Sequence, residues 1–216
     1  MTLHDILVYT GYLFLFINIL IYFKSCKNQN AAFKIFLLYL IGSLTLQIYS
    51  TFVKKYLGQH NLFISHYFFI GKFILLSLFF RQILKKSAIK KLVTILLYTI
   101  LVLLILNISF FNYNYASFNV FEIVITSFPL IIYCFLFFVQ KIEGSDGKYT
   151  YLVSGMFIYF LCSLLLFSVG NLTSSIKNFI WHFNAVLYIV YQVIIFIEWQ
   201  KNFRKKNIST VNELYK

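Results

Sequence analysis

The sequence predicts an all-α fold: a polytopic membrane protein whose seven transmembrane helices form a single bundle, with the N-terminus outside and the C-terminus cytosolic. Its 216 residues are 61% hydrophobic and only 12% charged, which is too apolar for a soluble domain. The apolar residues form seven long stretches, each near the roughly 20 residues that cross a hydrocarbon core about 30 Å thick. Lysine and arginine gather in alternate gaps between the stretches, as is typical of a chain that crosses a bilayer repeatedly.

The expected spans are residues 5–23, 33–53, 62–80, 92–111, 118–140, 150–170 and 178–199. Each is a continuous run rich in Leu, Ile and Phe, without the two-residue alternation of a barrel strand. Because backbone groups inside lipid must be hydrogen-bonded within the segment, each span is expected to be a helix. Pro129 should kink the fifth span, since it lacks a backbone donor. Residues 1–200 thus form the expected transmembrane domain, and residues 201–216 a basic cytosolic tail.

The basic residues also predict the orientation of the bundle. Fifteen of the 19 Lys and Arg residues fall on the side of the C-terminus, and three (Lys54, Lys55 and Lys177) fall on the other side. This excess indicates a cytosolic C-terminus. It also accounts for the net charge of +13 without a nucleic-acid partner. The expected cytosolic basic surface comprises Lys85, Lys86, Lys90, Lys91, Arg204, Lys205 and Lys206.

Ionisable residues inside spans are costly and usually face protein or water rather than lipid. Lys72 lies near the middle of span 62–80, Glu122 in the outer third of span 118–140, and Glu198 at the inner end of the last span. Glu198 is expected to make an ion pair with Lys201 or Arg204. At about 100° per residue, span 118–140 carries a polar stripe on one face, formed by Glu122, Thr126, Pro129, Tyr133 and Gln140.

Spans 33–53 and 178–199 add further polar faces, whereas span 92–111 carries few polar residues and is expected to be the most lipid-exposed. The stripe on span 118–140 fits a hydrated cavity, or equally ordinary hydrogen bonding between helices. The candidate residues for a cavity or ligand site are Lys72, Glu122, Thr126, Tyr133, His66, His182, Asn184, Tyr188 and Gln47.

All four histidines are expected at or near the outer face, at the depth of Glu122. A cluster of His66, His182 and Glu122 would suit a divalent metal or an external pH sensor. However, no HxxxH or HExxH pair places two ligands on one helix face, so scattered histidines with hydrogen-bonding roles are favoured. The three cysteines are widely spaced, which predicts neither a disulfide framework nor a thiolate site. We therefore expect no metal and no other cofactor.

Two segments carry a resemblance to a known group of proteins. They are His60-Asn61-Leu62-Phe63, which leads into the third span, and Trp181-His182-Phe183-Asn184-Ala185-Val186-Leu187-Tyr188, which opens the seventh. With the layout of the whole chain, they resemble seven-helix inner-membrane proteins of Bacteroidota. The resemblance implies a multi-pass protein of the bacterial inner (plasma) membrane, and it implies no activity.

Three classes of function are compatible with this sequence. The favoured one is a non-enzymatic module that senses a ligand or partner and signals through a separate cytosolic or membrane partner, because outward polar residues are combined with basic cytosolic loops. The alternative is an oligomeric channel, a small-solute transporter or a membrane-disrupting defence effector, motivated by the stripe beside Lys72. A lipid-modifying enzyme is favoured least, because no nucleophile or metal constellation converges.

Overall fold

The computed structural model describes residues 2–58, 61–110, 119–144, 147–169 and 174–204. Its elements are seven long α-helices and one short 3₁₀ turn, η1 (Cys26–Asn28), and no strand occurs in these ranges. The helices are α1 (Leu3–Ser25), α2 (Ala31–Tyr56), α3 (Leu62–Ile83), α4 (Ser87–Phe110), α5 (Val120–Ile142), α6 (Thr150–Val169) and α7 (Ser174–Asn202).

All seven helices are long and apolar enough to cross a membrane, which confirms the predicted all-α, seven-helix architecture. The ends differ from the prediction: α2 extends to Tyr56, and α7 begins at Ser174. The predicted span ends at 111, 118 and 170 lie outside the described residues. α5 continues as one helix through Pro129. The orientation of the whole bundle across the bilayer is predicted from the distribution of basic residues.

Six helices form a closed ring, because each packs on the next in the order α1, α2, α3, α5, α6 and α7, and α7 packs back on α1. α4 lies outside this ring, against α3 and α5. α4 and α1 bury the smallest share of their spans, 22% each. The fourth helix was predicted to be the most lipid-exposed. α4 is indeed among the two least buried helices, but α1 is buried to the same extent.

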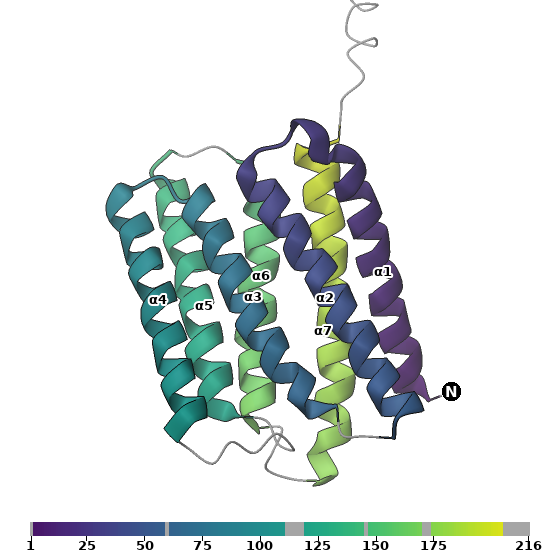
Figure 1. The fold of residues 1–216 in the computed structure, drawn as a ribbon. Helices are drawn as coiled ribbons and strands as arrows, with labels where there is room; N and C mark the ends of the chain where they lie inside the picture. Colours follow the sequence, from purple (N-terminus) through teal and green to yellow (C-terminus); the bar gives the residue numbers. More distant parts are fainter. Residues whose placement is uncertain (1, 59–60, 111–118, 145–146, 170–173, 205–216) are drawn as a thin grey trace, which may run out of the picture.

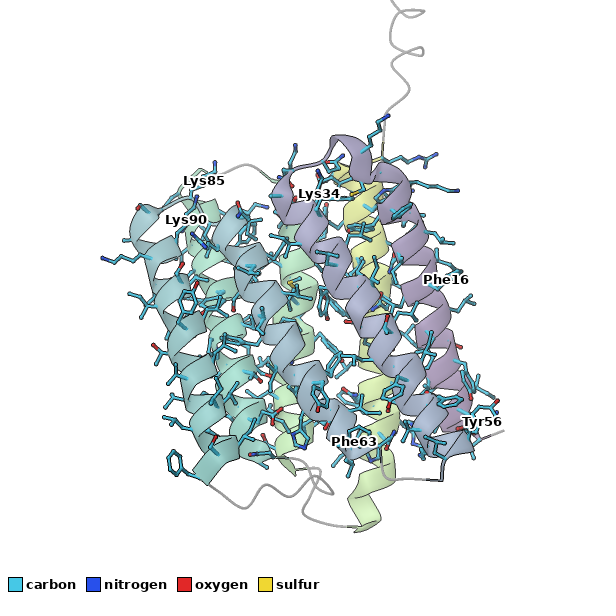
Figure 2. All side chains as sticks on the ribbon, viewed as in Figure 1. Phe16, Lys34, Tyr56, Phe63, Lys85 and Lys90 are labelled. Carbon is cyan, nitrogen blue, oxygen red and sulfur yellow. The ribbon has the colours of Figure 1, made fainter. Side chains whose placement is uncertain are left out.

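The two ends of the bundle differ in charge. One end, called here the basic end, carries the connections from α1 to α2, α3 to α4 and α5 to α6, together with the C-terminus of α7 (Figure 1). Figure 2 shows Lys34, Lys85 and Lys90 gathered at this end, and Lys86, Lys91 and Arg204 belong to it. Lys205 and Lys206 lie outside the described residues. The other end, where α1 begins, is called the cavity end.

An aromatic cluster fills the ring near the basic end. This aromatic plug consists of buried rings from α1, α2, α3 and the ends of α6 and α7, namely Tyr22, Phe33, Phe36, Phe79, Tyr149 and Phe203. Tyr22 stacks on Phe33 with ring centroids 4.8 Å apart, and Phe79 meets Tyr149 edge-on at 5.4 Å. Such aromatic pairs stabilise the fold beyond the contribution of the apolar area that they bury. Aromatic rings therefore fill the interior of the bundle at the basic end, and buried polar groups such as Glu122 lie toward the cavity end.

Candidate functional site

The polar stripe of α5 lies on its buried face. Glu122, Thr126, Tyr133 and Gln140 are all buried, together with Pro129. Tyr133 packs against Phe80 of α3, with ring centroids 5.7 Å apart. The stripe therefore faces α3 and the interior of the bundle, as the helical period predicts.

Glu122 and His66 form a buried pair between α5 and α3. The Nδ1 atom of His66 lies 2.7 Å from a carboxylate oxygen of Glu122. The backbone N–H of Glu122 donates to Asn119, the N-cap of α5, at 3.2 Å, and Asn119 in turn donates to Asn107 of α4 at 3.2 Å. Thr126 donates to the Glu122 carbonyl at 2.7 Å. The pair thus belongs to a network that joins α3, α4 and α5 near the cavity end.

Lys72 is also buried, six residues after His66 in α3. Its ammonium donates to the Ser127 hydroxyl of α5 at 3.2 Å. The rings of Phe69 and Phe160 surround the same ammonium, with centroids 5.0 and 5.1 Å from Nζ. A cation over aromatic faces gains from their quadrupoles, most of all where water is excluded. Lys72 is therefore enclosed between α3, α5 and α6.

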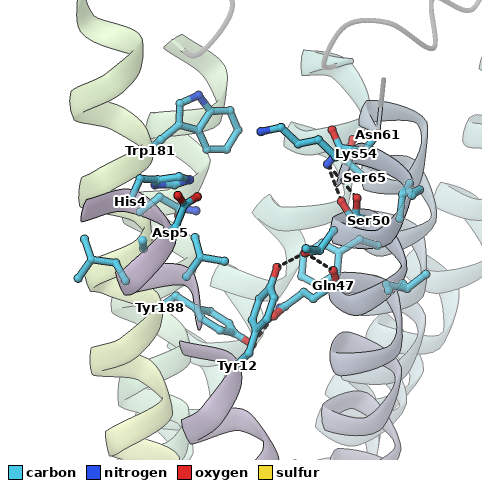
Figure 3. Close-up of a pocket in the computed structure, with 18 of the residues that line it drawn as sticks. His4, Asp5, Tyr12, Gln47, Ser50, Lys54, Asn61, Ser65, Trp181 and Tyr188 are labelled. Atoms are coloured by element: carbon cyan, nitrogen blue, oxygen red, sulfur yellow. Dashed lines mark hydrogen bonds between the residues drawn. The ribbon is translucent and has the colours of Figure 1, made fainter. Parts of the chain in front are cut away.

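A cavity of about 1400 Å³ occupies the cavity end, lined by residues of α1, α2, α3, α6 and α7 (Figure 3). Of the predicted candidates, the cavity is lined by Gln47, His182, Asn184 and Tyr188. The others belong to the interface of α3 and α5 described above, namely Lys72, His66, Glu122, Thr126 and Tyr133. The structure thus divides one predicted group into two sites, which share the wall formed by Phe69 of α3.

Hydrogen-bonded side chains form the inner surface of the cavity. The amide nitrogen of Gln47 donates to the Tyr188 hydroxyl at 2.9 Å, which joins α2 to α7. The hydroxyls of Tyr12 and Thr51 lie 3.1 Å apart, which joins α1 to α2 (Figure 3). Gly11 allows α1 this close to α7, because a Cβ there would lie 3.0 Å from the Tyr188 ring. The cavity therefore ends at a polar surface inside the bundle.

The mouth of the cavity holds most of its ionisable residues. Figure 3 shows Lys54 reaching from α2 toward the wall that carries His4, Asp5 and Trp181. The rings of His4 and His182 meet edge-on, with centroids 5.4 Å apart. Asp5 is engaged in a capping box, in which its carboxylate accepts the backbone N–H of Thr2 at 2.8 Å.

The hypothesised metal cluster of His66, His182 and Glu122 is not formed. His182 packs on His4 at the mouth, whereas His66 binds Glu122 at the α3–α5 interface. Within the described part of the chain, no three His, Cys, Asp or Glu side chains come together as metal ligands. His60 lies outside that part. The two histidines occupy different sites because they lie on helices that do not pack directly on each other.

Asn18 of α1 was not among the polar residues predicted to matter. Its side-chain amide is buried and donates to the backbone carbonyl and the side-chain oxygen of Gln192 in α7, both at 2.9 Å. An asparagine inside an apolar span was the available signal, because such amides commonly join membrane helices. This contact joins α1 and α7 between the cavity and the basic end.

Glu198 corrects another expectation. Its carboxylate is fully buried and accepts the backbone N–H groups of Tyr149 at 2.7 Å and Leu152 at 3.2 Å, at the start of α6. Asn202 donates to the same carboxylate at 2.7 Å. No ion pair of Glu198 with Lys201 or with Arg204, both described, is present. The carboxylate instead satisfies free donors at a helix N-terminus, where a negative charge is also favoured by the helix dipole.

Tyr149 connects this cap to α2. Its backbone is in the left-handed region, with φ of 67°, which is unfavourable for a bulky residue. Its hydroxyl donates to the side-chain oxygen of Asn30, the N-cap of α2, at 2.8 Å. Burial raises the pKa of Tyr149 to about 12, so the phenol stays protonated and remains a donor. Trp199 donates to Ser25 at 2.8 Å and adds α1 to the same set of contacts.

The fold defines the class of this chain: seven apolar helices make it a multi-pass integral membrane protein. No protein-family model, curated protein or solved structure matches it. Its function must therefore be inferred from the two polar sites and from the contacts at the basic end.

Proposed function

We propose that this membrane protein is a non-enzymatic ligand sensor. A small molecule binds in the cavity, and α7 transmits the binding to the basic end, where a separate protein partner responds. The observation that carries this proposal is the cavity itself: it opens at one end of the bundle and stops above the aromatic plug. A site closed at the other end suits binding better than conduction.

The arrangement of α7 supports the transmission step. Tyr188 of α7 contacts Gln47 at the cavity, Gln192 accepts from Asn18 one turn further on, and Glu198 caps α6 at the basic end. One helix therefore makes polar contacts at all three depths. A ligand that displaces Tyr188 would move the same helix that holds the strained Tyr149 backbone. With the orientation that the charges predict, the ligand arrives from outside and the partner meets the cytosolic basic surface.

Cysteine accessibility tests this proposal with a matched pair of positions on α2. Ser50 lines the cavity, whereas Ser43 is buried seven residues nearer the basic end, about 10 Å along the same helix face. Ser50→Cys and Ser43→Cys are made in a background where Cys26, Cys134 and Cys162 are replaced by Ala. A membrane-impermeant maleimide is then applied to either side of sealed vesicles.

A sensor predicts that Ser50→Cys reacts from the cavity side only and that Ser43→Cys reacts from neither side. Reaction of Ser43→Cys from the basic side would mean that the plug opens, as in a transporter with alternating access, and would overturn the sensor proposal. An unreactive Ser50→Cys would show that the cavity is closed to water. The side from which Ser50→Cys reacts also reports the orientation of the bundle.

A further inference from the structure

The mouth of the cavity is positively charged, against the trend of the chain. Among the basic residues that the structure describes, three belong to this end, and two of them, Lys54 and Lys55, line the cavity. Neither makes an ion pair with any acidic side chain in the described ranges. Asp5, the acidic lining residue, is held by the Thr2 N–H and keeps its negative charge, so Lys54, Lys55 and Asp5 together give the mouth a net charge of +1. A cavity with low-dielectric walls and a cationic mouth concentrates anions.

The walls behind this mouth are aromatic and aliphatic. Phe68 and Phe69 of α3 face the cavity together with Phe167 of α6 and Trp181 of α7. Phe167 and Trp181 meet edge-on, with ring centroids 5.9 Å apart. The volume of about 1400 Å³ exceeds the roughly 300–1,000 Å³ of ordinary small-molecule sites. The cavity therefore has room for a substantial apolar body as well as a charged group.

Two buried acceptors point to a third feature of the ligand. The side-chain oxygens of Gln47 and Asn184 are shielded from solvent and have no hydrogen-bond partner, and both residues line the cavity. Buried acceptors in proteins are nearly always paired, because an unmade hydrogen bond leaves the full cost of desolvation. A rotation of either side chain would bring its oxygen to the cavity surface, where a hydroxyl or amine on the ligand would supply the missing donor.

We infer that the ligand is an amphiphilic organic anion. Its carboxylate or phosphate group is held by Lys54 at the mouth, its apolar body lies against the aromatic wall, and a hydroxyl or amine on that body donates to Gln47 or Asn184. This inference rests on the proposed function and names the class of ligand that the sensor takes.

Trp181 offers a reporter for the test. The chain has two tryptophans, and Trp199 lies at the basic end, so Trp199→Phe leaves Trp181 as the one indole. The protein in zwitterionic nanodiscs is titrated with 2-bromododecanoate, 2-bromododecyl phosphate and 2-bromododecanol, whose bromine lies beside the polar group and therefore quenches an indole at the mouth. We expect saturable quenching by one or both anions, which distinguishes a carboxylate from a phosphate ligand, and only weak, unsaturable quenching by the alcohol.

Variants of Lys54 test the contact at the mouth. Lys54→Gln should raise the half-saturating concentration of the anion about tenfold, equivalent to about 1.4 kcal/mol, whereas Lys54→Arg should retain binding. Lys34→Gln removes the same charge at the basic end and should leave the midpoint unchanged. In competition, 12-hydroxydodecanoate should displace the brominated acid better than dodecanoate does, and Gln47→Leu should abolish this preference.

The outcomes separate this inference from the proposed function. Equal midpoints for the alcohol and the anions, with no effect of Lys54→Gln, would overturn the anion while leaving a binding cavity in place. No preference for the hydroxylated acid would overturn the donor group. If no probe quenches Trp181 and Ser50→Cys is also unreactive, the cavity does not bind from solution and the sensor proposal fails with it.

Discussion

Replacing Glu198 tests the contacts that hold the basic end together. The carboxylate is fully buried and accepts three hydrogen bonds, two of them from backbone N–H groups at the start of α6. Glu198→Ala leaves these donors buried without an acceptor. Glu198→Gln keeps one oxygen as an acceptor but directs an NH₂ group at the remaining donors. The two variants therefore remove the cap to different degrees.

The size of each effect follows from the number of donors that lose a partner. A buried donor without an acceptor costs about 1–3 kcal/mol, so the two backbone N–H groups predict a loss of about 2–6 kcal/mol in the free energy of unfolding for Glu198→Ala. Glu198→Gln should cost less, about 2 kcal/mol, because one hydrogen bond survives. The left-handed backbone of Tyr149 adds to the loss, since the carboxylate helps to hold it.

Equilibrium unfolding in mixed detergent micelles measures these differences. Glu143→Ala is the matched control, because Glu143 is exposed and pairs with exposed Lys86 at 2.7 Å. Removing a surface ion pair costs about 0–1 kcal/mol. If Glu198→Ala were no more destabilising than Glu143→Ala, the carboxylate would not be the cap of α6, and the account of the basic end would be wrong.

Three further predictions use the same unfolding measurement. His66→Ala should lower the free energy of unfolding by about 3–5 kcal/mol, because it removes a partner of buried Glu122. Replacing both residues with Leu should lower it less, and a double variant as unstable as His66→Ala would show that the loss does not come from leaving Glu122 without His66. Lys72→Met should have a free energy of unfolding within about 1 kcal/mol of the parent protein's, or above it, since the methionine side chain fills the volume of the lysine stem without burying an amine. A large loss of stability would indicate an electrostatic role for the ammonium. Gly155→Ala should cost about 1–3 kcal/mol, because its Cβ would lie 2.8 Å from Ile194; an unchanged stability would mean that α6 and α7 separate easily.

Several features of this protein follow from the sequence because they are local. A span of apolar residues must satisfy its own backbone in lipid, so hydropathy alone predicts seven helices and their order. Helical periodicity likewise places Glu122, Thr126 and Tyr133 on one face of α5, and the cost of burying polar groups in lipid turns that face inward. The basic residues predict an orientation by the same local logic.

The pairing of polar groups was decided by tertiary structure. His182 could have met His66 from its predicted depth, yet the ring of helices places it beside His4. Glu198 had basic neighbours in sequence, but α6 begins beside it with two free N–H groups. Each helix can satisfy its backbone at any rotation and beside any neighbour, so the sequence leaves these partners open. Only the packing of helices distant in the chain selects among them and hollows out the cavity at one end.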